Sequence, residues 1–114
     1  PLTMLVSDLH DVGKYGVMSN TAFRMVRRIL PGPYTLVLRG TSDVPRSMKN
    51  RDNEVGLRLP DHATCSMLVQ MLGEPLLTGS LTPGEQPPEL EDPEDFEARV
   101  RGDVDVILDS DPLW

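Results

Sequence analysis

The sequence predicts an α/β domain of α+β-like character, in which helices flank a mixed sheet. Short runs rich in leucine and β-branched residues alternate with amphipathic segments, the connections between them are long, and no segment repeats. A chain of 114 residues, 39% of them hydrophobic, has room for one modest core. The chain begins at Pro1, without a methionine, and ends on the apolar pair Leu113-Trp114. We therefore expect a single partial domain, truncated at both ends.

The first third of the chain predicts one strand and two helices. Residues 2–6 form an apolar stretch and predict a short buried strand, after which Ser7 and Asp8 supply an N-cap and an acidic first turn for a helix that ends near residue 15. Asn20 is the predicted N-cap of the second helix. Apolar residues of this helix recur at helical spacing and its arginines occupy the opposite side: Ala22, Phe23, Val26, Ile29 and Leu30 against Arg24, Arg27 and Arg28.

The middle of the chain predicts two strands separated by a polar loop. Pro31-Gly32-Pro33 ends the preceding helix, and residues 34–38 form a strand by their aromatic and β-branched content. Residues 40–53 are polar and predict an exposed loop, with a short helical turn after Pro45. The second strand covers residues 54–59, in which Val55, Leu57 and Leu59 are strand formers, and Pro60 ends it.

A third helix follows, with Asp61 as its predicted N-cap and Gly73 as its C-cap. Residues 75–78 predict another strand, the fourth in order along the chain. The expected core-facing side of the helix consists of Ala63, Met67, Leu68, Met71 and Leu72.

The last part of the chain is acidic. Residues at about 82–92 form a proline-rich acidic loop, and Asp92 then caps a helix over residues 93–101. Residues 104–108, Val-Asp-Val-Ile-Leu, predict a final strand.

Composition excludes several classes of protein. No run approaches the roughly 20 apolar residues that a membrane span needs, so we expect no membrane association. A single cysteine, Cys65, excludes an intramolecular disulfide and favours a cytoplasmic location. The net charge is −7, but residues 1–58 carry nine Lys/Arg against five Asp/Glu. That half can present a basic face to nucleic acid, or its charges can simply solvate the surface.

Arg58 is the first candidate for a binding residue, because it stands in a strand between Leu57 and Leu59. An unpaired guanidinium in such a place is expensive to bury, so it needs an anionic partner. That partner is either a carboxylate of the protein, for instance Glu54 or Asp61, or an anionic ligand. A ligand is favoured by the position at the carboxyl end of a strand, just before a helix N-terminus.

The loop Thr78-Gly79-Ser80 is the second candidate. It follows a strand and offers two hydroxyls, which can hold phosphate or carboxylate oxygens, while the glycine permits close approach. Loops of this kind are common, and the chain has neither a Walker A nor a Gly-x-Gly-x-x-Gly pattern.

Histidine and cysteine offer little support for catalysis. His62 is far in sequence from His10, so we expect a surface or capping histidine and no metal site. Cys65 has no accompanying base and is expected to pack in the core. Ser80 has no recognisable histidine partner, which argues against a hydrolase.

Three colinear segments carry a family resemblance. They are Leu-Pro-Gly-Pro-Tyr-Thr at 30–35, Val-Gly-Leu-Arg-Leu-Pro-Asp-His at 55–62, and Gly-Glu-Pro-Leu-Leu-Thr-Gly-Ser at 73–80. The opening segment and the closing Val-Asp-Val-Ile-Leu fit the same pattern, so the match spans nearly the whole chain. Together they resemble the YrdC-like domain of the Sua5/YciO/YrdC family, most closely its YciO branch.

The resemblance implies a twisted mixed sheet with flanking helices and a concave, positively charged cavity. It implies that L-threonine, bicarbonate and ATP, with Mg²⁺ as the companion ion of the ATP substrate, give threonylcarbamoyl-AMP and pyrophosphate. By this likeness Arg58 and Thr78 contact the threonine, Ser80 contacts the nucleotide phosphates, and Thr35 lines the nucleotide side of the same cavity. The product serves to make threonylcarbamoyladenosine in transfer RNA.

The chain departs from the family pattern at three points. The usual Ser-x-Asn motif becomes Ser-Leu-Thr at 80–82, and Glu54 stands where threonine is common, four residues before Arg58. The family's Lys-x-Arg motif would lie before Pro1 and a later arginine beyond Trp114. We therefore expect the fragment alone to be inactive.

Two functions follow from the resemblance. One is a threonylcarbamoyl-AMP synthase of the transfer-RNA modification class. The alternative is a non-catalytic module of the YciO type that binds a nucleotide or double-stranded RNA.

Overall fold

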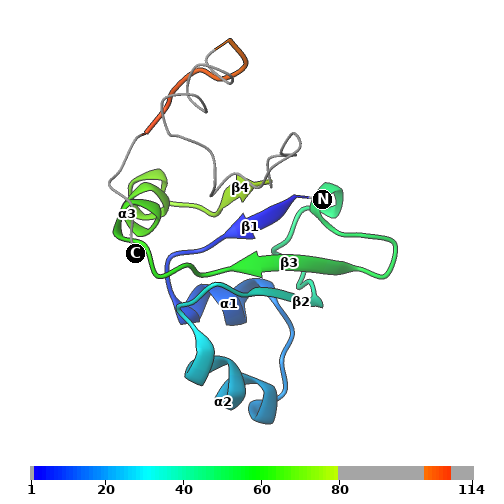
Figure 1. Ribbon diagram of the computed structural model, residues 1–114. Helices are drawn as coiled ribbons and strands as arrows, with labels where there is room; N and C mark the ends of the chain where they lie inside the picture. The colour runs from blue at the N-terminus through cyan, green and yellow to red at the C-terminus, as the bar shows by residue number, and fades with distance from the viewer. Residues whose placement is uncertain (1, 80–101, 109–114) are drawn as a thin grey trace, which may run out of the picture. The chain divides into compact units, whose positions relative to one another are not determined.

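A computed structural model describes residues 2–79 and 102–108, and the chain divides into two units, residues 1–80 and 81–114. Helices and strands alternate in the first unit in the predicted order, including the short helical turn after Pro45 (Figure 1). The elements are β1 (Thr3–Leu5), α1 (Leu9–Tyr15), α2 (Asn20–Ile29), β2 (Thr35–Arg39), the 3-10 turn η1 (Arg46–Met48), β3 (Glu54–Arg58), α3 (Ala63–Leu72) and β4 (Leu76–Thr78).

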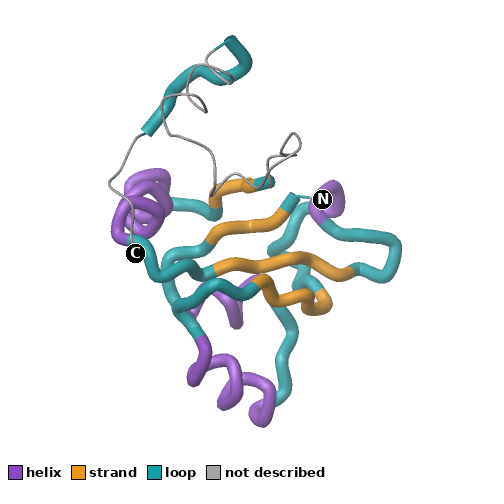
Figure 2. Tube along the Cα trace, in the orientation of Figure 1, coloured by secondary structure: helices purple, strands orange, loops and turns teal. Residues whose placement is uncertain are grey.

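The four strands form one mixed sheet in the order β2-β3-β1-β4 (Figure 2). β1 lies inside the sheet, parallel to β3 and antiparallel to β4, while β2 pairs antiparallel with β3. The first strand in the sequence therefore pairs with the third and fourth strands. The predicted α/β class with a mixed sheet and flanking helices is confirmed.

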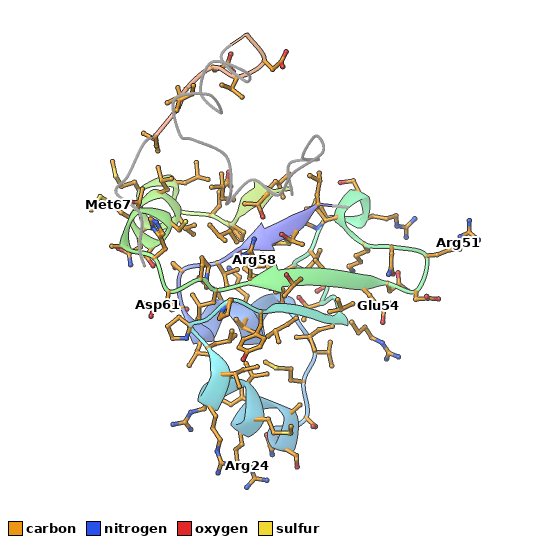
Figure 3. All side chains as sticks on the ribbon, in the orientation of Figure 1. Arg24, Arg51, Glu54, Arg58, Asp61 and Met67 are labelled. Atoms are coloured by element: carbon orange, nitrogen blue, oxygen red, sulfur yellow. The ribbon has the colours of Figure 1, made fainter. Side chains whose placement is uncertain are left out.

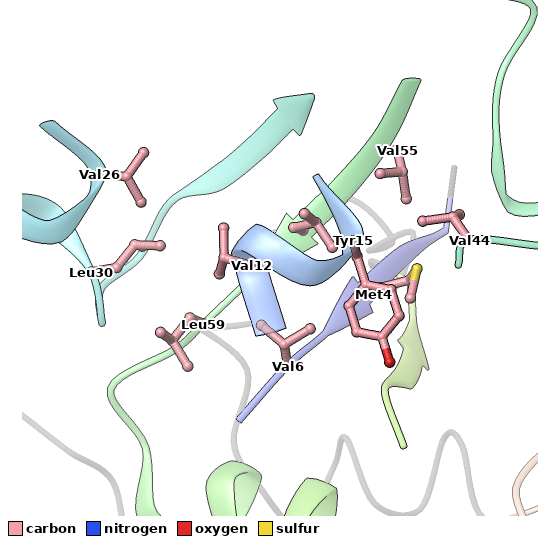
Figure 4. Close-up of a cluster of buried hydrophobic side chains, with 10 residues drawn as sticks. Met4, Val6, Val12, Tyr15, Val26, Leu30, Val44, Val55 and Leu59 are labelled. Atoms are coloured by element: carbon pink, nitrogen blue, oxygen red, sulfur yellow. The ribbon is translucent and has the colours of Figure 1, made fainter. Parts of the chain in front are cut away.

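The core lies between one face of the sheet and helices α1 and α2 (Figure 4). The period-2 alternation of β3 turns Val55 and Leu57 toward these helices, and both side chains are buried. The helical periodicity of α2 likewise turns Val26 inward and leaves its arginines exposed. The core cluster consists of Met4, Val6, Val12, Tyr15, Val26, Leu30, Val44, Val55, Leu57 and Leu59.

The Pro-Gly-Pro loop fastens the start of β2 to the end of β3. The backbone N–H of Gly32 donates to the carbonyl of Leu59 at 3.0 Å. Only glycine fits here, because a Cβ at this position would lie 2.6 Å from the carbonyl oxygen of Ile29. The loop thereby places Thr35 beside the carboxyl end of β3, where Arg58 lies.

Two of the predicted N-caps are wrong by one residue. Ser19, not Asn20, caps α2, and its Oγ accepts the N–H of Ala22 at 3.1 Å. His62, not Asp61, caps α3. In both cases adjacent residues are plausible caps, and the choice depends on which side chain reaches a free helical N–H.

The expectation of a capping histidine at position 62 is confirmed. His62 Nδ1 accepts the N–H of Thr64 at 3.2 Å. Asp8 caps α1 as predicted, since its Oδ1 accepts the N–H of Asp11 at 2.9 Å. Gly73 ends α3 with φ of 78°, in the left-handed region that favours glycine.

The predicted core-facing side of α3 is wrong. Val69 is its buried residue, and Cys65 and Ser66, one turn earlier, are half-buried. Apolar residues occur on more than one side of this helix, so a 3.6-residue period fits more than one buried face. The prediction chose the face with the larger side chains, and that choice was wrong. Cys65 is a free thiol and only partly buried. All five residues that were expected inside are exposed: Ala63, Met67, Leu68, Met71 and Leu72.

The predicted strand at 104–108 is also wrong, because this segment of the second unit has no strand structure. Val104, Val106 and Leu108 are exposed. A β-branched segment becomes a strand only through hydrogen bonds to a neighbouring strand, and propensity alone does not supply one. The predicted acidic loop at 82–92 and helix at 93–101 lie outside the described residues.

Candidate functional site on the sheet

The side chains of β3 that do not enter the core lie on the opposite face of the sheet. These are Glu54, Gly56 and Arg58, because successive residues of a strand point to alternate faces. Residues paired in register share a face, which assigns their neighbours on the other strands. We call this the groove face, and it consists of Thr3, Leu5, Thr35, Val37, Arg39, Glu54, Gly56, Arg58, Leu76 and Thr78.

Three of the four sequence-predicted site residues therefore lie on one face of one sheet. They are Thr35 of β2, Arg58 of β3 and Thr78 of β4, which are contributed by segments far apart in the sequence. The fourth, Ser80, lies outside the described residues. Among the described residues, no group of three or more His, Cys, Asp or Glu side chains is placed to hold a metal ion.

Arg58 is half-buried and pairs directly with Thr35 across the strands. On the other side of β3 it pairs with Leu5, and its carbonyl accepts the N–H of Val6 at 2.9 Å. Its backbone is thus held by two neighbouring strands. No ion pair joins the guanidinium to Glu54 or Asp61 within the described part of the chain, so the salt-bridge alternative gains no support.

Glu54 and Arg58 lie near the two ends of β3 (Figure 3). They are four positions apart in extended chain, which corresponds to about 13 Å along the strand. The two opposite charges therefore mark separate ends of the groove face.

Thr78 is already hydrogen-bonded within the sheet. Its Oγ1 lies 2.7 Å from Oγ1 of Thr3, its register partner, and donates to the carbonyl of Thr3 at 3.4 Å. A hydroxyl has one proton and two lone pairs, so Thr78 can still accept a hydrogen bond from a ligand. To donate one, it must give up its contact with Thr3.

A groove of about 440 Å³ runs over this face toward η1. Thr35 lines it, whereas Arg58 and Thr78 are absent from its lining. Its walls are largely apolar, and its polar lining residues are Thr3 and Thr35 on the sheet together with Ser47, Lys49, Asn50 and Glu54. The lining residues are Leu2, Thr3, Thr35, Val37, Ser47, Met48, Lys49, Asn50, Glu54, Val55 and Gly56.

Gly56 forms the floor of this groove. A Cβ at this position would lie 2.9 Å from Cγ2 of Thr3 and 3.5 Å from Cγ2 of Thr35. The two threonine methyl groups therefore close in from the neighbouring strands and occupy the space that a side chain at position 56 would need, so glycine is required here.

Asn50 holds the carboxylate of Glu54, a role that the sequence did not reveal. Its Nδ2 donates to Oε1 of Glu54 at 3.0 Å. Its Oδ1 accepts the backbone N–H groups of Glu54 at 2.8 Å and Asp52 at 2.9 Å. An asparagine that bonds the backbone two residues on is typical of a turn, which was the available signal. Asn53 completes the turn with φ of 60°.

Comparison with known proteins places the chain among relatives that are longer than it. It is 36% identical over 108 residues to the uncharacterized protein YciO of Escherichia coli K12, which covers 93% of this chain and 52% of YciO. It is 29% identical over 113 residues to threonylcarbamoyl-AMP synthase of Bos taurus, covering 99% of this chain and 40% of that protein. The chain thus spans about half the length of the curated relatives it matches, or less.

Solved structures agree in fold. The crystal structure of E. coli YciO superposes with a TM-score of 0.81 at 33% identity, covering 91% of this chain and 51% of YciO. The structure of P. abyssi Sua5 complexed with L-threonine gives a TM-score of 0.63 at 26% identity, over 70% of this chain and 24% of Sua5. A family model described as telomere recombination, Sua5_yciO_yrdC, matches residues 1–113. The chain belongs to the Sua5/YciO/YrdC family.

Proposed function

We propose that this chain supplies the substrate-binding sheet of a threonylcarbamoyl-AMP synthase. The reaction joins the amino nitrogen of L-threonine to the carbon of bicarbonate and transfers AMP from ATP, with release of pyrophosphate and water. Threonylcarbamoyl-AMP synthases among the relatives, and a Sua5 structure with L-threonine, support this class of reaction.

The observation that carries the proposal is the placement of Arg58. Its guanidinium belongs to a half-buried side chain on the groove face, directly across from the hydroxyl-bearing Thr35. A guanidinium binds a carboxylate through two parallel N–H···O bonds, which fixes orientation as well as charge. Arg58 therefore binds the threonine carboxylate in this proposal, and catalysis comes mainly from positioning and charge stabilisation.

The remaining predicted residues take supporting roles. Thr35 directs its hydroxyl to the nucleotide side, since it lines the groove. Thr78 accepts a hydrogen bond from the threonine substrate while it stays bonded to Thr3. Ser80 contacts the phosphates of ATP, with Mg²⁺ as the companion of that substrate.

Pyrophosphate release by the full-length protein tests the proposal. The assay measures release from ATP with and without L-threonine and bicarbonate, for the wild type, Arg58→Ala and the control Arg51→Ala. Arg51 is exposed in the loop before β3, so its loss leaves the site unchanged. The proposal requires release that depends on both substrates and is lost in Arg58→Ala. Equal pyrophosphate release by the wild type and Arg58→Ala would contradict the proposal.

A non-catalytic RNA-binding function is the second candidate. Arg24, Arg27 and Arg28 are all exposed on α2, on the side opposite the buried Val26. Residues three and four apart form one helical face, so these arginines present a cluster of positive charge that suits phosphates.

Duplex RNA binding across a salt series tests this candidate. Affinity that falls steeply with salt and drops when the three arginines become alanine supports binding by α2. The control replaces Arg46 and Arg51, two exposed arginines elsewhere in the same unit. An unchanged affinity in the α2 triple variant removes this candidate.

A further inference from the structure

Two cavities adjoin on the face of the sheet opposite the groove face. Met4 of the core cluster lines one of them together with Leu77, its register partner on β4. The two cavities have volumes of about 340 Å³ and 290 Å³, and together they have room for a small organic molecule. We call them the Tyr15 cleft, because they share three lining residues: Tyr15, Glu74 and Pro75.

The two halves of the Tyr15 cleft differ in character. The larger half is mainly apolar, with Met4, Met48 and Leu77 in its walls. Met48, in η1, also lines the groove on the other face. The smaller half is mainly polar and is lined by residues of α1 and of the end of α3, among them Asp11 and Gln70. A ligand that fills both halves therefore needs an apolar body and a polar end.

The hydroxyl of Tyr15 is free to bind such a ligand. The side chain is only 9% exposed, since its ring packs in the core cluster. Tyr15 nevertheless lines both halves of the cleft, and its hydroxyl points away from the neighbouring apolar side chains (Figure 4). This oxygen forms no hydrogen bond with the described residues, and none of their fully buried side-chain oxygens lacks a partner, so it must open into the cleft. A largely buried phenol normally has a hydrogen-bond partner, which a ligand can supply here.

Negative charge is concentrated at the polar half. The last turn of α3 contains no basic residue that could balance the partial negative charge of its C-terminal carbonyls. Glu74 follows the C-cap Gly73 directly and adds a carboxylate at the same end. Asp11 adds another, whose Oδ2 accepts the hydroxyl of Ser7 at 3.2 Å. Neither carboxylate forms an ion pair within the described part of the chain, so this half favours a cation.

Lys14 opposes these carboxylates. It lines the polar half, and its Nζ lies 5.3 Å from the centroid of the Tyr15 ring, within the range of a cation–π contact. Asp43, in the larger half, brings the carboxylates of the cleft lining to three, against this one ammonium. The balance therefore remains negative. Since Lys14 repels a cationic ligand and attracts an anionic one, its removal reports the sign of the ligand's charge.

We propose that the Tyr15 cleft binds a small organic amine. The ammonium group lies in the polar half, where it donates to the carboxylates of Glu74 and Asp11 and to the hydroxyl oxygen of Tyr15. The apolar body lies in the larger half, against Leu77 and the two methionines. The site is on the other face of the sheet from Arg58, so the inference does not depend on the proposed function.

Three probes with one apolar body test this inference on the full-length protein. They are 2-phenylethylamine, 2-phenylethanol and 3-phenylpropionate, which carry a positive, a neutral and a negative end on the same phenylethyl group. Dissociation constants are measured by calorimetry or by NMR titration of backbone amides. We expect the amine to bind about tenfold more tightly than the alcohol, as is typical of a hydrogen bond to a charged group. The carboxylate should bind no more tightly than the alcohol.

Matched variants locate the amine in the cleft. Glu74→Gln should weaken amine binding several-fold, and its control is Asp52→Asn, which removes the same charge at an exposed position before β3. Tyr15→Phe keeps the packed ring but removes the hydroxyl, so it should also weaken the amine. Its control is Tyr34→Phe, at an exposed tyrosine. Lys14→Gln should strengthen amine binding, because it removes the repelling charge.

Several outcomes overturn the inference. It fails if no probe binds, or if the alcohol or the carboxylate binds as tightly as the amine. It also fails if either Glu74→Gln or Tyr15→Phe binds the amine as tightly as the wild type, if a control loses as much affinity as its partner, or if Lys14→Gln weakens the amine. The wild-type ranking of the three probes decides the matter where a variant does not fold.

Discussion

The hydroxyls of Thr3 and Thr78 lie 2.7 Å apart, although the two residues are separated by 75 positions in the sequence. They join the two strands β1 and β4 on the face that also holds Arg58. This hydrogen bond thus helps to hold β1 and β4 together, and it engages the hydroxyl of Thr78, a residue that we propose to contact the substrate.

Removing one of these two hydroxyls should destabilise the fold. Thr3→Val or Thr78→Val each leaves a part-buried hydroxyl without its partner, and we expect a loss of about 1 kcal/mol in the free energy of unfolding. The double variant should lose less than the sum, because both partners are then apolar and of similar shape. Urea denaturation of all four proteins measures this coupling. Additive losses would contradict the hydrogen bond.

Two glycines should respond oppositely to alanine. A Cβ at Gly16 would lie 2.6 Å from Cδ1 of Leu38 and 3.0 Å from Cδ1 of Leu57, whereas a Cβ at Gly13 meets nothing within 4 Å. Gly16→Ala should destabilise by about 1–3 kcal/mol through overpacking. Gly13→Ala, inside α1, should stabilise by about 0.5–1 kcal/mol. Thermal or urea unfolding gives both values, and equal signs would contradict the packing described at Gly16.

The cap of α3 should depend on the nature of residue 62. His62→Ala removes the acceptor for the N–H of Thr64 and should cost about 1 kcal/mol. His62→Asn should restore most of that stability, since asparagine is a strong N-cap. His10→Ala, at an exposed position in α1, is the control. If alanine and asparagine at position 62 give equal stabilities, the capping role is wrong.

The core face of β3 should be far more sensitive than the edge of the sheet. Leu57 is fully buried, while Leu77 of β4 is 52% exposed. Leu57→Ala should lower the free energy of unfolding by about 2–5 kcal/mol through lost contacts and a cavity. Leu77→Ala should change it by less than about 1 kcal/mol, because little apolar surface is buried there. Comparable losses at both sites would place Leu77 in a buried environment instead.

The sequence predicted a strand over residues 54–59 with Arg58 among apolar residues, and the structure has a strand at Glu54–Arg58. The face of each side chain is a finding of the structure: the period of two in a strand buries Val55, Leu57 and Leu59 and turns Arg58 to the other side. The terminating effect of Pro-Gly-Pro and the C-cap at Gly73 were predictable from local sequence alone.

Features that depend on distant partners were not predictable. Neither the register of Thr3 with Thr78 nor the approach of the Thr3 and Thr35 methyl groups over Gly56 leaves a local signal. The same limit explains the error on α3, where tertiary packing buries Val69 and leaves larger neighbours exposed. It also explains the segment 104–108, which has strand propensity but no strand structure among the described residues.

The central position of β1 has a consequence for how the chain folds during synthesis. This strand leaves the ribosome before β3 and β4, yet it pairs with β3 at Leu57 and Arg58 and with β4 at residues 76–78. Its apolar side chains stay unpaired with the sheet until most of the first unit has been synthesised. Such long-range strand pairing makes a domain slow to fold. We therefore expect a chaperone-dependent stage in which β1 is exposed and prone to aggregation.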